Sequence, residues 1–193
     1  QGRDPAKKDG GPQIPIVEHA DVRRMLLRQK AIVEGALCLS LTAARLVDRA
    51  AHHADETVRA ESQQLLDLLT PIVKTFPAER GFESVALALQ IHGGYGYSSE
   101  YPVEAWLRDQ KLNTIHEGTS GIQGLDLLGR KVVAHGGASL ALLLREIAST
   151  VEEAQKAGVS PAVCEAMGTA SQTLAATTMA LGQRGLAGDV AGM

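Results

Sequence analysis

The sequence predicts an all-α protein, an antiparallel bundle of the four-helix type with an additional helical extension at its carboxy-terminal end. Hydrophobic residues make up 45% of the chain, and many of them are Ala and Leu, which favour helices. Aromatic residues make up only 3%, and β-branched residues do not cluster into alternating runs, so a sheet protein is not expected. Apolar residues recur instead at spacings of three, four and seven from about residue 21 onward.

The first expected elements are an arm and a long helix. Residues 1 to about 18 combine Pro, Gly and mixed charges without periodicity, which predicts an extended arm or linker. A helix over about residues 21–51 would be about 45 Å long at 1.5 Å per residue, a length typical of bundles. Its apolar side is formed by residues at helical spacing, namely Val22, Met25, Leu26, Val33, Ala36, Leu37, Leu41, Ala44 and Val47.

Two helices are expected after a turn at His52–Asp55. One runs over about residues 56–74, where Thr70-Pro71 should kink or interrupt it because proline lacks the backbone N–H. The other runs over about residues 78–91 and ends at the glycine-rich loop His92–Tyr97.

Shorter helices complete the bundle and form the extension. Two are expected over about residues 102–110 and 120–135. Gly136-Gly137 then separates a further helix that reaches about residue 158. Ser160-Pro161 opens the last helix, because Ser is a favoured N-cap and Pro a favoured first-turn residue.

These elements group into three expected segments. They are an arm over residues 1–18, a helical bundle over residues 19–135 and a helical extension over residues 136–193. The chain begins with Gln rather than Met and ends in a Gly-rich tail. We therefore expect it to be a fragment of a larger enzyme and the extension to be truncated.

Charge and composition narrow the classes of partner. A net charge of −3 provides no positive surface for nucleic acid or anionic lipid. No apolar stretch reaches the roughly 20 residues that span a bilayer, and no signal peptide is visible. Cys38 and Cys164 lie in apolar helical patterns, so we expect buried free thiols and a cytoplasmic location. No set of residues has metal-ligand spacing.

Two glycine-containing loops are candidates for chemistry. The glycines of His92-Gly93-Gly94-Tyr95-Gly96-Tyr97 let the backbone approach a ligand, but without a preceding strand or GxGxxG spacing they indicate only a helix end. In Thr114-Ile115-His116-Glu117-Gly118-Thr119-Ser120, Thr119 or Ser120 can cap the next helix, and Glu117 precedes its positive end. On its own, that acidic residue indicates electrostatic stabilisation of the helix. Two glycines early in that helix are unfavourable by about 1 kcal/mol each, which hints at a functional site.

Four blocks between residues 90 and 123 change this interpretation. They are Gln90–Tyr97, Glu100–Glu104, Leu107–Asp109 and Ile115–Thr119 with Ile122-Gln123. The residues of these blocks, their order and their spacing resemble the carboxy-terminal signature of the acyl-CoA dehydrogenase family. The stretch from Glu117 to Lys131, and the helices after about residue 135, are similar to an extended branch that includes 3-methylmercaptopropionyl-CoA dehydrogenases.

The resemblance implies a flavin-dependent enzyme of fatty acid metabolism that converts an acyl-CoA thioester to a trans-2-enoyl-CoA. Glu117 stands at the position of the base that removes the α-proton, while FAD accepts the β-hydrogen as hydride. Gln90, Gly93 and Gly94 stand where the family contacts the adenosine half of an FAD bound to a neighbouring subunit. Thr119 stands where the family contacts the FAD diphosphate.

The resemblance also implies substrate contacts and partners. Gly118 and His116 stand at substrate-contacting positions, and His116 replaces a common Tyr, which makes the rim of the acyl pocket more polar. The implied partners are an acyl-CoA, an electron-transfer flavoprotein as electron acceptor and further copies of the chain in a dimer or tetramer. The family's amino-terminal helical domain and central β-domain are not in this sequence. We therefore expect the isolated chain to be inactive.

Two other interpretations stay open from the sequence. The bundle can be a non-catalytic helical module that mediates self-association, in which case the complete protein would take up no FAD. Alternatively, the chain can belong to an acyl-CoA oxidase-like flavoenzyme, which differs in how its reduced flavin is reoxidised. Flavin absorbance tests the first interpretation and oxygen consumption tests the second.

Overall fold

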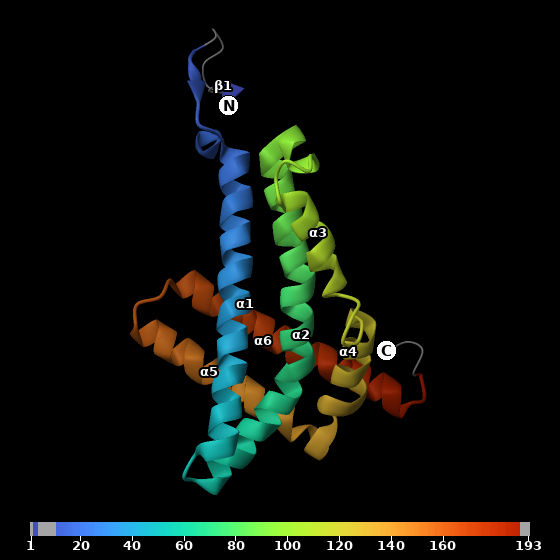
Figure 1. The fold of residues 1–193 in the computed structure, drawn as a ribbon. Coiled ribbons are helices and arrows are strands. Elements are labelled where there is room, and N and C mark those ends of the chain that lie inside the picture. Colours follow the sequence, from blue (N-terminus) through green and yellow to red (C-terminus); the bar gives the residue numbers. More distant parts are fainter. Residues whose placement is uncertain (1, 4–10, 190–193) are drawn as a thin grey trace. The chain divides into compact units, whose positions relative to one another are not determined.

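The computed structural model describes residues 2–3 and 11–189, and helices dominate it (Figure 1). The predicted all-α class is confirmed. The helices fall into two compact units. Unit 1 comprises Gln1–Asp48 and Leu69–Gly124, and unit 2 comprises Arg49–Leu68 and Leu125–Met193.

The long first helix is confirmed almost residue for residue. α1 spans Ala20–His52. The turn after it is closed by Asp55, whose Oδ1 accepts the backbone N–H of Thr57 at 2.8 Å. Hydrogen bonds from the backbone N–H groups of Thr57 and then Val58 hold the pKa of the Asp55 carboxyl below its ordinary value. Asp55 is therefore the N-terminal capping residue of the helix that follows.

Of the kink or interruption expected at Thr70-Pro71, the interruption is wrong, and so is the break expected between helices over about residues 56–74 and 78–91. α2 runs without a break over Glu56–His92 and contains both Pro71 and Pro77. A proline inside a helix removes one backbone hydrogen bond and costs about 3 kcal/mol or more. Here Pro71 is fully buried and lies beside the buried Leu68 and Leu69. Burial of this apolar run offsets the local cost, so packing overrides the propensity that predicted two separate helices.

Three short elements follow α2. The 3₁₀ turn η2 spans Gly93–Tyr97, α3 spans Val103–Leu112 and α4 spans Ser120–Asp126. Gly96 is buried in η2, where a Cβ atom would lie 2.5 Å from the backbone oxygen of Leu89. Only glycine fits there without a shift of the backbone, so the glycine-rich loop folds back directly on the end of α2.

Unit 1 is a layer of helices in which α2 lies between α1 and α3 (Figure 1). The guanidinium of Arg28 on α1 donates to the Glu83 carboxylate on α2. On the other side, Gln110 of α3 donates to the backbone oxygens of Pro77 and Ala78 at 3.3 and 3.2 Å. Val103 is the most deeply buried residue of α3, at 2% exposure.

Unit 2 contains the π-helical turn Leu127–Lys131, the 3₁₀ turn η4 (Ala134–Gly137) and the helices α5 (Ala138–Lys156) and α6 (Pro161–Leu186). The helix expected over residues 120–135 therefore ends earlier, at Lys131, after α4 continues into the π-helical turn. Val132 N–H donates to the Leu127 oxygen at 2.8 Å, five residues back, which turns the α-helical pattern into a π-helical one. The left-handed His135, with Gly136 and Gly137, then ends the segment.

The extension helices agree with the expected positions in most respects. Ser160 occupies the N-cap position before Pro161, but its side chain makes no capping hydrogen bond. Cys164 on α6 is a buried free thiol, as expected. Cys38 is also a free thiol, yet it is exposed on α1, so the expectation of burial is wrong for it.

The arm contains a short strand pair. Gly2–Arg3 (β1) pairs antiparallel with Gln13–Ile14 (β2), and the 3₁₀ turn η1 (Ile16–Glu18) leads into α1. Residues 4–10 of the expected arm lie outside the described residues. The division into arm, bundle and extension stays a prediction.

Within residues 2–3 and 11–189, no single helix is both long and apolar enough to span a bilayer. The bent pair formed by Ser120–Lys131 and Ala134–Lys156 passes the same test only when the two are taken together.

The ion pair between α1 and α2 predicts a pH dependence of stability. Hydrogen bonds from Arg28 and then Arg80 lower the pKa of the Glu83 carboxyl. The resulting stabilisation is present above the ordinary carboxyl pKa of about 4.3 and is lost as the pH falls through the lower folded-state value. Glu83→Gln should therefore lower the urea midpoint at pH 6.5 and lower it much less at pH 3. Glu152→Gln, an exposed change on α5, is the control, and equal pH dependence of wild type and Glu83→Gln would contradict the prediction.

Candidate functional site

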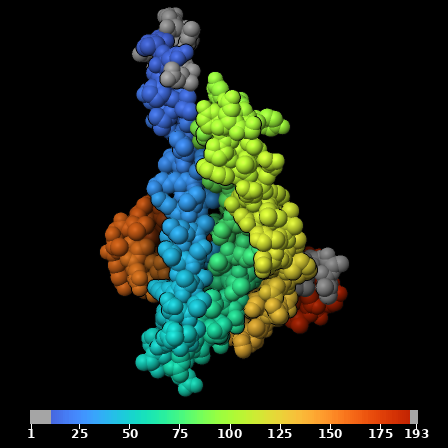
Figure 2. All heavy atoms as spheres, viewed as in Figure 1, coloured from blue at the N-terminus to red at the C-terminus, as the bar shows by residue number. Residues whose placement is uncertain are grey.

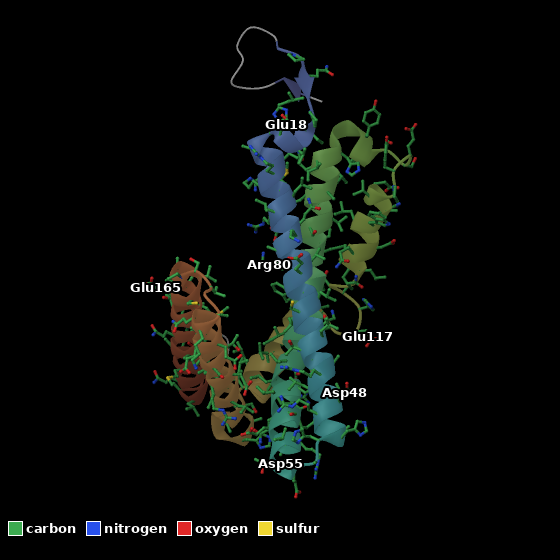
Figure 3. All side chains as sticks on the ribbon, turned by 90° about the vertical axis from the view of Figure 1, so that its left-hand side faces the viewer. Glu18, Asp48, Asp55, Arg80, Glu117 and Glu165 are labelled. Carbon is green, nitrogen blue, oxygen red and sulfur yellow. The ribbon has the colours of Figure 1, made fainter. Side chains whose placement is uncertain are left out.

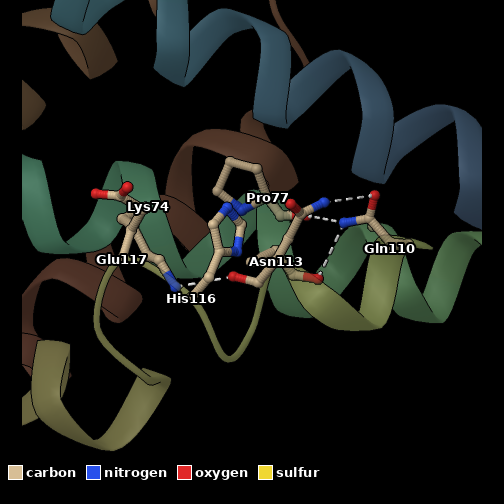
Figure 4. Close-up of a pocket in the computed structure, with 8 residues that line it drawn as sticks. Lys74, Pro77, Gln110, Asn113, His116 and Glu117 are labelled. Carbon is tan, nitrogen blue, oxygen red and sulfur yellow. Dashed lines mark hydrogen bonds between the residues drawn. The ribbon is translucent and has the colours of Figure 1, made fainter. Parts of the chain in front are cut away.

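A pocket of about 390 Å³ lies in unit 1 (Figure 4). One wall comes from α2, and the other comes from α3 and the loop between α3 and α4. The lining residues are Lys74, Pro77, Ala78, Gly81, Gln110, Asn113, His116 and Glu117. His116 and Glu117, two of the residues singled out from the sequence, therefore share one pocket.

Lys74 connects the α2 wall to the loop. Its half-buried side chain donates from Nζ to the backbone oxygen of Asn113 at 2.8 Å and to that of Gly118 at 2.7 Å. These two oxygens lie on either side of His116 and Glu117 in the sequence. The loop is therefore fixed to α2 at both ends of its pocket-lining part.

The backbone at Glu117 is left-handed. Glu117 has a φ of 57° and the following Gly118 has a φ of 88°. A non-glycine residue in this region is strained, and such residues concentrate at functional sites. Gln123 supports the conformation, because its Nε2 donates to the Glu117 backbone oxygen at 3.1 Å.

The Glu117 side chain is free to act on a ligand. It is exposed on the loop between α3 and α4 (Figure 3), and its carboxylate has no hydrogen-bond or ion-pair partner among the described residues. Thr119 caps α4 as expected, since its Oγ1 accepts the Ile122 backbone N–H at 3.3 Å. Ser120 instead donates its hydroxyl to the Glu79 carboxylate on α2.

The α3 wall is ordered by amide groups. Gln110 reaches the α2 backbone, as described above, and its Oε1 accepts from Asn113 Nδ2 at 3.3 Å. A Cβ atom on Gly81 would lie 2.5 Å from Gln110 Nε2, so the missing side chain at Gly81 makes room for this amide. His116 is exposed, and its Nδ1 lies 2.9 Å from the Leu112 backbone oxygen.

The other predicted cofactor residues lie elsewhere in unit 1. Gln90, Gly93 and Gly94 are exposed at the far end of α2, and Gln90 lies roughly 24 Å along that helix from Lys74. A Cβ atom on either glycine would meet nothing within 4 Å, and Gly93 has a φ of 61°. The structure therefore brings Glu117, Gly118, Thr119 and His116 together, and it keeps the Gln90–Gly94 group apart from them.

Several pocket residues were not predicted from the sequence. Lys74, Gln110 and Asn113 act through contacts between segments distant in the chain, and no local pattern marks them. Gly81 did offer a signal, because a glycine inside a helix is unfavourable by about 1 kcal/mol unless something needs the space. In the described part of the chain, no group of three or more His, Cys, Asp or Glu residues could hold a metal ion.

Comparison with known proteins relates the chain to one family. Residues 4–132 match the family described as "Acyl-CoA dehydrogenase, C-terminal domain". The chain is 43% identical over 154 residues to 3-methylmercaptopropionyl-CoA dehydrogenase of Ruegeria pomeroyi, covering 79% of this chain and 26% of that protein. It is 36% identical over 137 residues to a butyryl-CoA dehydrogenase of Syntrophomonas wolfei, covering 71% and 22%. It is 36% identical over 142 residues to a broad-specificity linear acyl-CoA dehydrogenase of Mycobacterium tuberculosis, covering 73% and 23%. The chain thus spans about a quarter of the length of these curated relatives.

The left-handed conformation of Gly118 predicts that a methyl group added at this residue will destabilise the loop. Gly118→Ala adds a Cβ atom that would lie 2.8 Å from Gln123 Nε2, at a residue with positive φ. We expect faster hydrogen exchange in the peptide covering residues 113–124, equivalent to a loss of about 1–2 kcal/mol in local stability. Gly124→Ala is the matched control, because its Cβ would meet nothing within 4 Å, and it should not accelerate exchange. Equal exchange in Gly118→Ala and wild type would contradict the prediction.

Proposed function

Because this chain belongs to the acyl-CoA dehydrogenase family, we propose that it is the carboxy-terminal helical part of a flavin-dependent enzyme that dehydrogenates acyl-CoA thioesters. The names of the three relatives described above all refer to acyl-CoA substrates, which supports this substrate class. The observation that carries the proposal is Glu117, a residue with strained backbone and an unpaired carboxylate at the edge of a pocket. The isolated chain is expected to be inactive.

We propose that Glu117 is the catalytic base. Its carboxylate takes the proton from the α-carbon of the thioester, and the electron pair of that C–H bond becomes the second bond between the α- and β-carbons. The β-hydrogen must leave with its own electron pair, and bound FAD supplies the acceptor for this hydride. The product is a trans-2-enoyl-CoA. Fixing the Glu117 backbone before substrate arrives avoids an entropic cost at the moment of reaction.

The proposed FAD contacts are consistent with the chemistry of the residues. The Thr119 hydroxyl accepts a backbone N–H through its oxygen and still has its own proton to donate to a diphosphate oxygen. Gly93 and Gly94 leave open space above their backbone, which suits close approach of an adenosine group, and Gln90 is exposed beside them. Since Gln90 lies roughly 24 Å along α2 from Lys74, we propose that this group contacts the FAD of a neighbouring copy.

We propose that His116 and Gly118 contact the substrate. Both are next to Glu117 in the sequence, and His116 lines the same pocket with an exposed ring. An imidazole at the rim provides a polar group where an acyl-CoA would enter. The electron-transfer flavoprotein as electron acceptor and the cytoplasmic location stay predictions.

An exposed apolar stripe on α1 supports the proposal of a homo-oligomer. Figure 2 shows one face of α1, coloured from blue to cyan. Leu37 is 57% exposed, and it belongs to a stripe formed by Leu26, Val33, Leu37, Leu41 and Val47. These residues recur at spacings that place them along one side of the helix. A stripe of this kind suits packing against a helix of another copy.

The role of Glu117 predicts a defined loss in the complete enzyme. Glu117→Gln keeps the size of the side chain but removes its basicity, so it should retain FAD and lose most of its flavin bleaching by acyl-CoA. Absorbance between about 370 and 450 nm reports both properties. Unchanged bleaching would mean that the base lies elsewhere. A complete protein that takes up no FAD would favour the non-catalytic helical module instead.

The α1 stripe predicts an assembly that a single charge disrupts. Leu37→Asp should lower the molar mass of the complete protein measured by light scattering after size exclusion, because the carboxylate would be buried unpaired in the interface. Ala31→Asp adds the same charge at an exposed α1 position outside the stripe and should leave the mass unchanged. Equal masses for wild type and Leu37→Asp would assign the stripe to contacts within one copy.

A further inference from the structure

Lys74 is the one charged side chain of the α2 wall that lines the pocket, in the part of the chain that the structure describes. We propose that Lys74 is a positioning residue that holds the Glu117 loop in its left-handed conformation. The inference rests on the proposed role of Glu117 as base. Lys74 itself would touch neither the α-carbon nor the flavin and would act only through the loop.

The first support is the placement of its two hydrogen bonds. The acceptor oxygens belong to Asn113 and Gly118, at 2.8 and 2.7 Å, so they enclose the segment that carries His116 and Glu117. One ammonium group thus fixes both ends of the segment to the same point on α2. Bonds of this kind, from a charged donor, are stronger than those between neutral groups.

The second support is the absence of a competing partner. Lys74 is half-buried, and no carboxylate pairs with it among the described residues. A partly desolvated ammonium needs acceptors, and the two loop oxygens are those that the described structure provides. If the loop moved away, Lys74 would lose both acceptors at once. The positions of the loop and of the Lys74 side chain are therefore coupled.

The third support is the strain that the loop carries. Glu117 is left-handed and, unlike Gly118, has a Cβ atom that disfavours this conformation. The hydrogen bond from Gln123 reaches the Glu117 oxygen from the α4 side, and Lys74 reaches the neighbouring Gly118 oxygen from the α2 side. Without the Lys74 donors, the loop can relax toward ordinary backbone angles. The carboxylate would then spread over several positions relative to the substrate.

Such a change should affect the chemical step more than binding. A displacement of about 1 Å at a reacting group can lower a rate by about 100-fold, because the reacting atoms must be aligned. Binding of the acyl-CoA depends on the whole substrate and should change much less. A residue with only a structural role would instead lower flavin content, binding and rate together.

The test uses the complete enzyme loaded with FAD and reduced anaerobically in a stopped-flow instrument. The probe is the linear acyl-CoA, from butyryl-CoA upward, that bleaches the wild-type flavin fastest. Lys74→Met keeps most of the apolar stem without donors, and Lys74→Arg keeps charged donors. Lys156→Met makes the same change at an exposed residue of α5, outside the pocket and outside the α1 stripe, and it serves as the control.

Lys74→Met should reduce the flavin about 10- to 100-fold more slowly, with a substrate Kd within about threefold of wild type and FAD content unchanged. Lys74→Arg should recover most of the rate, and Lys156→Met should match wild type. Combining Lys74→Met with Glu117→Gln should be no slower than Glu117→Gln alone, because both changes act on the same step. If Lys74→Met does not retain FAD, Lys74→Gln replaces it in the same comparison.

Three outcomes would overturn the inference. A wild-type rate in Lys74→Met, with bleaching lost in Glu117→Gln, would leave the proposed function intact and remove the role of Lys74. Equal losses of rate and affinity would make Lys74 a structural residue of the pocket. A double variant much slower than Glu117→Gln would mean that Lys74 acts independently of Glu117. Unchanged bleaching in Glu117→Gln would instead contradict the proposed function itself.

Discussion

The hydrogen bonds from Lys74 to the Asn113 and Gly118 oxygens join the two walls of the pocket, and much of unit 1 is arranged so that they can form. Lys74, Ala78 and Gly81 recur at helical spacing, so they lie on one side of α2 only if the helix is continuous. The two helices expected over about residues 56–74 and 78–91 would have placed Lys74 and Gly81 on separate helices. The continuous α2 is therefore a precondition of the pocket.

The sequence predicted those elements whose signals are local. The α1 helix has a long apolar period and was predicted to within one residue at each end, and Thr119 was recognised as a possible cap of α4. The continuous α2 was not predicted, because the cost of a proline inside a helix can be read from the local sequence, whereas the burial that offsets this cost depends on the fold. Pro71 lacks a backbone donor, which the sequence reveals, but its complete burial depends on the fold.

The site residues also divide into those that the sequence located and those that only contacts between distant segments reveal. Glu117, His116 and Gly118 were located by resemblance to a family, and the structure adds that Glu117 is left-handed and lines a pocket. Lys74 was not predicted, because its partners lie about 40 residues away in the sequence and no spacing rule connects them. Likewise, Gly81 is understandable only next to Gln110, whose amide would collide with a Cβ atom. The positions of long-range polar contacts are therefore the information that the fold supplies.

The energies involved explain why the loop needs more than one support. A left-handed non-glycine residue costs on the order of 1–3 kcal/mol, whereas a hydrogen bond from a charged donor contributes about 1.5–3 kcal/mol. The two Lys74 bonds are thus sufficient to hold Glu117 in place, and the Gln123 amide adds a neutral bond. A glycine at residue 117 would remove the strain but also the carboxylate. Within this loop, the strain is therefore confined to the residue whose side chain is proposed to react. Gly118 beside it also has a positive φ, but a glycine adopts this conformation without a similar cost.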